Sequence, residues 1–336
     1  MAATPTVKVE VASLDPGDGT LISVSILMPV FNRQGLVRDA VASALAQTHP
    51  EFELIIVDDG STPPLERAAL GEGAGDSRIK VIRQENAGSS AARNTAMKLA
   101  TGNYVLFLDS DDLLTPDALR VLCEGSRGGE IDAVVGNWTN FTNNVETAPT
   151  RPSMPYRDTL ANTIEGGWST GSAILRRGLE EEMSPIWMPW EVAEYYMKAM
   201  RRPTSTVVHV DHHVVSMRQD SPDRLTDLYS HFDPIKAGLF WRTMKASFPL
   251  DDERRSAFDR HLFRFAFSAF HSGLRREAEE IVAAIDVDRL PQYHWYRFFS
   301  PAWFVRWGGV GVGLPLQAAV HGMKKRLLGK GNQDRE

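Results

Sequence analysis

One stretch, Tyr104 to Asp112, constrains the fold of this chain more than any other. Its first five residues, Tyr104-Val-Leu-Phe-Leu, are all apolar or aromatic, which is typical of a strand buried on both faces of a parallel sheet. Three carboxylates then follow within four positions, at Asp109, Asp111 and Asp112. Ligands of open α/β sheets bind beyond the carboxyl ends of the strands, and we expect these acids to lie there.

The spacing of these acids fits two interpretations. Closely spaced carboxylates repel one another and are best tolerated around a hard divalent cation, which predicts a metal site. The alternative is a solvated acidic loop that caps a helix beginning near Thr115-Pro116. The spacing alone does not decide between the two.

Strands and helices alternate along residues 23–112 with short connections. This alternation predicts an α/β fold with a mostly parallel sheet and right-handed crossovers. The expected strands are Val24–Met28, Phe52–Val57, Ile79–Ile82 and the stretch from Tyr104, and the expected helices are Leu36–Leu45 and Ser89–Ala100.

The chain after Asp112 divides into a further part of this domain and a helical extension. We expect a flexible leader over 1–22, the α/β domain over 23–228 and a helical carboxyl-terminal extension over 229–336. Within the domain we distinguish two parts, 23–112 and 113–228. Later elements are expected at Pro116–Glu124, Ile131–Val135, Thr170–Leu175, Trp190–Arg201 and Thr206–Val210.

Composition excludes several classes of protein. The single cysteine, Cys123, allows no internal disulfide and no cysteine-based zinc cluster, and it suits a reducing, cytoplasmic location. The leader has no apolar core of a signal peptide, and no run of 18 uncharged apolar residues predicts a membrane span. A net charge of −6 argues against a nucleic-acid binder.

Acids follow a second strand as well, at Asp58-Asp59, so two acidic clusters are expected at one edge of the sheet. At this point the sequence resembles the inverting family 2 glycosyltransferases, which have the GT-A fold. The resemblance covers about residues 23–220 and rests on four motifs in order. They are Val24-Ser-Ile-Leu-Met-Pro29-Val-Phe31-Asn32-Arg33, Ile56-Val-Asp58-Asp59-Gly-Ser-Thr62, Glu85-Asn-Ala-Gly88-Ser-Ser-Ala-Ala-Arg93-Asn94 and Phe107-Leu-Asp109-Ser-Asp111-Asp112.

The resemblance implies a Rossmann-like, nucleotide-binding sheet, with 23–112 as the nucleotide-sugar-binding part and 113–228 as the acceptor side. A UDP-sugar is the expected donor. Asp59 would accept a hydrogen bond from N3–H of uracil, which suits a carboxylate. Pro29 and Phe31 would line the nucleotide cleft, and Arg33 would bring positive charge to the diphosphate. Arg93 would do the same, or would form a structural ion pair with Asp109 or Asp59.

The acids after the fourth strand match the DXD motif of this family. The resemblance assigns Asp111 to a Mn²⁺ or Mg²⁺ ion, Asp109 to the ribose or the metal, and Ser110 to the nucleotide. Asp112 would lie behind them. Such a metal bridges the two phosphates and stabilises the charge on the departing diphosphate.

The family supplies its general base from a Glu-Asp pair at the start of a helix. Here Glu191 matches the glutamate, but Val192 stands where the aspartate is expected. We predict Glu191 as the base, with Glu194 as an alternative, and the alternative to both is a helix-end acid favoured by the macrodipole.

Two further residues are candidates on the acceptor side. Trp168 is expected either to stack on a sugar ring or to pack in the core. Arg218 resembles the basic residue of a late loop that closes over the diphosphate. Neither assignment follows from spacing alone.

Residues 294–330 carry a charge of +6 with seven interleaved aromatic residues, whereas residues 1–293 carry −11. Aromatic and cationic residues together suit an anionic bilayer surface, so we expect either peripheral membrane contact on the cytoplasmic face or an aromatic core packed on the domain.

The sequence thus predicts a metal-dependent, inverting glycosyltransferase. It would move a sugar from a nucleotide-sugar to a hydroxyl of a glycan, a glycolipid, a polysaccharide or a carrier-lipid-linked acceptor. Because of Val192, the alternative is a non-catalytic or weakly active sugar-nucleotide or glycan-binding protein on the same fold.

Overall fold

The computed structural model describes residues 22–142, 145–152, 157–166, 168–180, 182–184, 190–221, 234–271 and 273–285. The chain forms two compact units, Met1–Leu228 and Tyr229–Glu336. Most of the predicted leader and all of the basic aromatic segment 294–330 lie outside the described residues. Ile22, at the end of the predicted leader, is buried.

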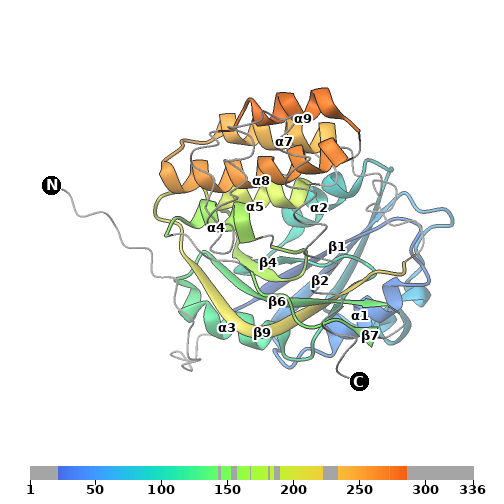
Figure 1. Cartoon of the computed structure of the whole chain (residues 1–336). Coiled ribbons are helices and arrows are strands. Elements are labelled where there is room, and N and C mark those ends of the chain that lie inside the picture. Colours follow the sequence, from blue (N-terminus) through green and yellow to red (C-terminus); the bar gives the residue numbers. More distant parts are fainter. Residues whose placement is uncertain are drawn as a thin grey trace, which may run out of the picture. The chain divides into compact units, whose positions relative to one another are not determined.

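In the first unit the described strands form one nine-stranded sheet in the order β3-β2-β1-β4-β8-β6-β9-β5, with β7 paired to β6 (Figure 1). The four strands from β3 to β4 are parallel, as the alternating pattern predicts, and β8 is the first antiparallel neighbour. The strands are β1 (Val24–Val30), β2 (Phe52–Asp59), β3 (Ile79–Gln84), β4 (Tyr104–Phe107), β5 (Leu113–Leu114), β6 (Ala133–Thr142), β7 (Val145–Glu146), β8 (Ala173–Arg176) and β9 (Val207–Arg218).

Helices cover both faces of this sheet, because the strands of its parallel half are apolar on both faces. Alternate residues of β1 and β2 pack with α1 and α3 on one face, and the others pack with α2 and α5 on the opposite face (Figure 1). The helices of this unit are α1 (Val37–Leu45), α2 (Ser89–Leu99), α3 (Ala118–Gly125), α4 (Thr159–Gly166) and α5 (Glu191–Ala199), with 3₁₀ turns at Arg67–Gly75 and Arg127–Gly129.

The strand register brings the acidic loops together. Val30 at the end of β1 pairs with Asp58, and Asp59 pairs with Gln84 at the end of β3. The strand β4 runs parallel to β1 on its other side, so the loop that carries Asp109 leaves the sheet at the same edge.

The second half of the sheet departs from the expected boundaries. A strand was expected over Ile131–Val135, with strand edges and loops after it, but β6 runs from Ala133 to Thr142 beside a long β9. Its polar side chains are satisfied within the sheet, because Asn137 donates to Asp211 at 2.9 Å and bonds with His209 at 2.8 Å. Buried polar groups with partners do not end a strand.

The second unit is described over three helices, α7 (Pro234–Ser247), α8 (Asp252–His271) and α9 (Arg275–Val282). Phe240, Phe258 and Leu262 are fully buried in its core. No helix in the described part of the chain is both long enough and apolar enough to span a bilayer.

Candidate active site

Asp58, the first of the two acids that end β2, uses its carboxylate to stabilise the adjoining loop. Its carboxylate accepts hydrogen bonds from the main-chain N–H groups of Ser61 at 2.9 Å and Leu65 at 3.0 Å, and it pairs with Arg83. Burial alone would raise the pKa of Asp58, but these hydrogen bonds outweigh it and hold the pKa below its usual value. Asp58 therefore shapes the loop and leaves ligand contact to its neighbour.

Asp59 is also buried, yet it keeps one acceptor position. Its Oδ1 accepts from Gln84 Nε2 at 2.7 Å and from the N–H of Ala87 at 3.0 Å, and its Oδ2 accepts from the N–H of Gly88 at 2.8 Å. A carboxylate offers about four lone-pair positions, so one position on Oδ2 remains for a ligand. Such a position suits the predicted N–H donor of a uracil ring.

Gln84 was not anticipated from the sequence, and its orientation is fixed by a second contact. Thr95 on α2 donates its hydroxyl to Gln84 Oε1 at 2.7 Å, which turns the amide nitrogen toward Asp59. The signal was available in principle, because parallel pairing of β2 with β3 places Gln84 opposite Asp59.

The loop after β1 is joined to the loop after β2. The N–H of Asn32 donates to Ser61 Oγ at 2.9 Å, and the N–H of Thr62 donates to Asn32 Oδ1 at 2.8 Å. Beside this contact, Pro29 is half-buried and Phe31 is 48% exposed. A large exposed aromatic ring at this edge is available to a flat nucleotide base.

Arg93 on α2 joins the DXD loop to α5. Its guanidinium donates to Asp109 Oδ1 at 2.6 Å and to Glu191 Oε1 at 3.0 Å, and only 6% of its side chain is exposed. Burial disfavours the cation, but the two carboxylates outweigh it and raise the pKa of Arg93. The ion pair with Asp109 is the structural alternative that the sequence left open.

Glu191 and Glu194 lie at the start of α5 and are both buried. Ser89 at the start of α2 also donates to Glu191 Oε1, at 2.7 Å, whereas Oε2 has no hydrogen-bond partner among the described residues. Glu194 instead pairs with Lys198 at 3.0 Å. Val192, in the position of the expected aspartate, packs in the apolar cluster under the sheet.

The remaining DXD residues face two arginines. Asp111 lies 3.8 Å from Arg33 and is 18% exposed, and Ser110 is buried. Arg218 at the end of β9 holds the loop from the far side: its N–H donates to Asp112 at 2.9 Å and its Nε donates to the carbonyl oxygen of Asp111 at 3.2 Å. Arg218 thus contacts the acidic loop, which its position 106 residues away does not reveal.

The acids fit a cation that takes most of its ligands from a substrate. Within the described ranges no group of three or more acidic, histidine or cysteine side chains is arranged to hold a metal ion. Mg²⁺ bound to nucleotides uses one or two protein carboxylates together with phosphate oxygens and water. Asp111, whose side chain has only the distant contact with Arg33 among the interactions described above, meets that requirement.

Trp168 is buried in the apolar cluster of α5 and packs against Tyr196, with ring centroids 5.6 Å apart. This is the packing in the core that was predicted as the alternative to stacking on a sugar. Tyr196, which the sequence did not single out, also packs on Phe107 of β4, with centroids 6.3 Å apart.

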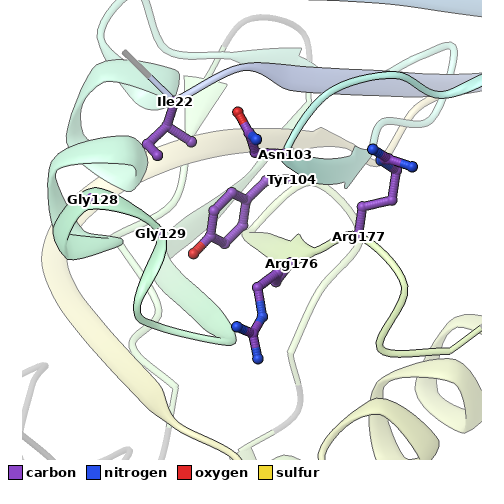
Figure 2. A pocket seen from close by; sticks show the side chains of 7 residues that line it. All are labelled: Ile22, Asn103, Tyr104, Gly128, Gly129, Arg176 and Arg177. Carbon is purple, nitrogen blue, oxygen red and sulfur yellow. The ribbon is translucent and has the colours of Figure 1, made fainter. Parts of the chain in front are cut away.

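Figure 2 shows a cavity of about 390 Å³ elsewhere in this unit. Tyr104 begins β4 whereas Asp109 follows its end, so the cavity lies at the opposite end of that strand from the acids. Its arginines are engaged, because Arg176 pairs with Asp132 and Arg177 donates to a main-chain carbonyl at 2.6 Å. We therefore place the chemistry at the acids. The cavity is lined by Ile22, Asn103, Tyr104, Gly128, Gly129, Arg176 and Arg177.

Comparison with known proteins gives one family. The family described as Glycosyl transferase family 2 matches residues 25–183. Glycosyltransferase GlyA of Streptococcus pneumoniae is 37% identical over 118 residues, which are 35% of this chain and 17% of GlyA. The WfgD protein of Escherichia coli, a UDP-Glc:alpha-D-GlcNAc-diphosphoundecaprenol beta-1,3-glucosyltransferase, is 36% identical over 122 residues, which are 36% of this chain and 47% of WfgD. The chain spans less than half the length of these relatives.

A solved structure matches over most of the chain. The crystal structure of residues 1–349 of TarS from Staphylococcus aureus, in complex with UDP-GlcNAc, superposes with a TM-score of 0.69 at 17% identity. The match covers 89% of this chain and 92% of that one. At this identity the likeness establishes the fold.

Proposed function

Residues 25–183 of this chain belong to glycosyltransferase family 2 and have the GT-A fold, and from this premise we propose the activity of the protein. It transfers a sugar, with inversion at the anomeric carbon, from a UDP-sugar to a hydroxyl group of a glycan, a glycolipid, a polysaccharide or a carrier-lipid-linked acceptor. The reaction depends on a divalent cation at Asp111.

One observation carries the proposal, the bridge of Arg93 between Asp109 and Glu191. Asp109 belongs to the motif that is expected to meet the donor, and Glu191 is the candidate base. A single buried side chain contacts both carboxylates, at 2.6 and 3.0 Å, so donor group and base belong to one site. General-base catalysis requires such proximity.

The donor half of the site is formed by loops at the carboxyl edge of the sheet. Asp59 offers its one remaining acceptor position to the uracil N–H, and the ring of Phe31 faces the base. Arg33, 3.8 Å from Asp111, supplies positive charge for the diphosphate. A Mn²⁺ or Mg²⁺ ion held by Asp111 would offset the negative charge that develops on the departing diphosphate.

The acceptor half centres on Glu191. Its Oε2 takes the proton of the acceptor hydroxyl while that oxygen forms a bond to the anomeric carbon. The bond between this carbon and the diphosphate breaks, and UDP leaves with the electron pair. Ser89 and Arg93 bind Oε1 and so hold the carboxylate with Oε2 directed away from them.

Relatives support the donor class and the type of acceptor. WfgD is named for a UDP-glucose donor and a sugar acceptor on diphosphoundecaprenol, and TarS was crystallised with UDP-GlcNAc. Membrane contact through residues 294–330 stays a prediction, because that segment lies outside the described residues.

The substitution Glu191→Gln tests the proposal, with Glu194→Gln as its matched control. Glutamine keeps an acceptor for Ser89 and Arg93 but accepts no proton, so we expect UDP release to fall by at least 10³-fold. Calorimetry with UDP and Mn²⁺ should show nearly unchanged affinity in both variants.

The outcomes separate the alternatives. Normal turnover in Glu191→Gln together with loss in Glu194→Gln would move the base to Glu194. If the unmodified protein binds UDP only with Mn²⁺ but releases none from any UDP-sugar, with or without acceptor glycans, the protein is a binding module.

A further inference from the structure

Several buried polar atoms of the candidate site have no hydrogen-bond partner among the described residues. Among the described residues, Arg93 Nε, Glu191 Oε2, Tyr196 OH and Trp168 Nε1 are all buried and have no hydrogen-bond partner. Buried polar atoms are almost always paired in folded proteins, because an unpaired one costs about 1–3 kcal/mol. A polar ligand bound in this region would complete several of them at once.

Tyr196 belongs to this group by position as well as by chemistry. It stands on α5 with Glu191, and its ring packs on Trp168 and on Phe107, two residues before Asp109. Burial raises the pKa of its hydroxyl, and the charges of Arg93 and Asp109 both act on it, the first lowering and the second raising that pKa. The ring of Tyr196 therefore packs at the end of β4, the strand that leads to Asp109.

The neighbouring Tyr195 shows what a structural tyrosine looks like here. It is as buried as Tyr196, its ring packs edge-on against Phe107 with centroids 5.2 Å apart, and its hydroxyl donates to the carbonyl oxygen of Glu180 at 3.1 Å. The hydroxyl of Tyr195 is hydrogen-bonded within the protein, whereas the hydroxyl of Tyr196 has no hydrogen-bond partner among the described residues.

We propose that Tyr196 is a donor-sugar-binding residue, whose hydroxyl donates a hydrogen bond to a hydroxyl of the sugar carried by UDP. Besides Glu191 Oε2, which is proposed to meet the acceptor hydroxyl, the orphaned atoms here are donors on Arg93, Tyr196 and Trp168 and an acceptor on Glu194. A sugar hydroxyl both accepts and donates, so sugars match such a mixed set, whereas a phosphate only accepts.

The position of Tyr196 assigns that sugar to the donor. The ring of Tyr196 packs on Phe107 at the end of β4, just before Asp109, on the side of the site where the diphosphate is proposed to bind. The sugar joined directly to the diphosphate is the nearest hydroxyl-bearing group. This assignment rests on the proposed function, since it presupposes that the acids bind a UDP-sugar.

Calorimetry with Mn²⁺ tests the inference on the full chain, its Tyr196→Phe variant and its Tyr195→Phe variant. The probes are UDP, UDP-glucose, UDP-galactose and UDP-N-acetylglucosamine. For the sugar that the unmodified protein binds most tightly, we expect Tyr196→Phe to raise Kd about tenfold. Its Kd for UDP, and both Kd values of Tyr195→Phe, should stay within about twofold.

Thermal unfolding separates a ligand-binding role from a structural one. Tyr196→Phe removes no protein hydrogen bond, so its melting temperature should equal that of the unmodified protein, whereas Tyr195→Phe should melt lower. Unchanged UDP-sugar affinity in Tyr196→Phe, with a lowered melting temperature, would assign the hydroxyl to a buried water and overturn the inference. If the unmodified protein binds no UDP and no UDP-sugar, the proposed function fails first and this inference with it.

Discussion

Asp58 and Asp111 lie at the carboxyl ends of two strands of the same sheet, yet their carboxylates differ in exposure and in hydrogen bonding. The carboxylate of Asp58 is 1% exposed and receives two main-chain N–H groups and Arg83. The carboxylate of Asp111 is 18% exposed, and its closest described cation is Arg33 at 3.8 Å. Asp59 lies between these extremes, with three donors and one open position.

The difference separates acids that stabilise the fold from acids that remain available to a ligand. A carboxylate whose lone pairs are filled by the chain stabilises a loop and has little left for substrate. An acid that is left open at a partly exposed position adds little to the stability of the free protein, whereas a ligand or metal that binds it stabilises the folded state. Substitutions at the two kinds of acid should therefore change different measurements.

The largest expected effect is on the open acid. Asp111→Asn should lower UDP release on the order of 10³-fold, because it weakens the site proposed for the cation that offsets charge on the diphosphate. The melting temperature should stay close to that of the unmodified protein. Glu51→Gln, an exposed acid at the start of β2, serves as control and should leave both values unchanged. A melting temperature that falls as steeply in Asp111→Asn as activity does would break the comparison.

The next effect is on the saturated acid and concerns stability. Asp58→Asn places an amide nitrogen against the N–H of Leu65 and the guanidinium of Arg83, so the free energy of unfolding should fall by about 2 kcal/mol. Urea denaturation at neutral pH measures it. Asp76→Asn is the matched control, because Asp76 also pairs with an arginine, Arg78, but at the surface. Its loss should stay below about 1 kcal/mol, and an equal loss in the two variants would contradict the role of burial.

A smaller effect should follow at the intermediate acid. Gln84→Leu removes one of the three donors that fix Asp59, so Kd for UDP should rise about five- to tenfold. Thr95→Val should act in the same direction but more weakly, because it only frees the amide of Gln84 to turn. If neither variant changes UDP affinity in calorimetry, the main-chain N–H groups of Ala87 and Gly88 suffice to hold Asp59.

The smallest expected effect concerns the free energy of unfolding at acidic pH. Burial would raise the pKa of Glu53, but hydrogen bonds from Lys80, Ser25 and Thr101 outweigh it and lower the pKa to about 2. A depressed pKa gives stability that is present above the unfolded value, near 4.5, and is lost as pH falls toward 2.

Glu53→Gln should therefore flatten the fall in unfolding free energy between about pH 4.5 and 2. The slope should change modestly, since Lys80 is half exposed and solvent screens the pair. Denaturation at several pH values checks it. An unchanged slope would show that Glu53 titrates alike in the folded and unfolded chains.

The parallel half of the sheet was predictable from the sequence because its elements are local. Apolar runs with polar ends define strands such as Phe52–Asp59, and parallel pairing then fixes where Asp58 and Asp109 emerge. The later half was predicted less well. Asn137 and its neighbours look like loop residues, and only their partners on β9 show that they belong to a strand.

The sequence by itself determined the family, the order of the acidic motifs and the edge of the sheet where they meet, since these depend on short patterns and on strand polarity. Tertiary structure decided which acids remain open. It joined Arg93 to Glu191, 98 residues apart, left Tyr196 OH without a partner among the described residues, and set Gln84 at the end of β3 against Asp59. These outcomes depend on which distant side chains pack together. A repeating pattern of apolar and polar residues fixes which face a residue occupies, but it does not specify the partner that residue meets.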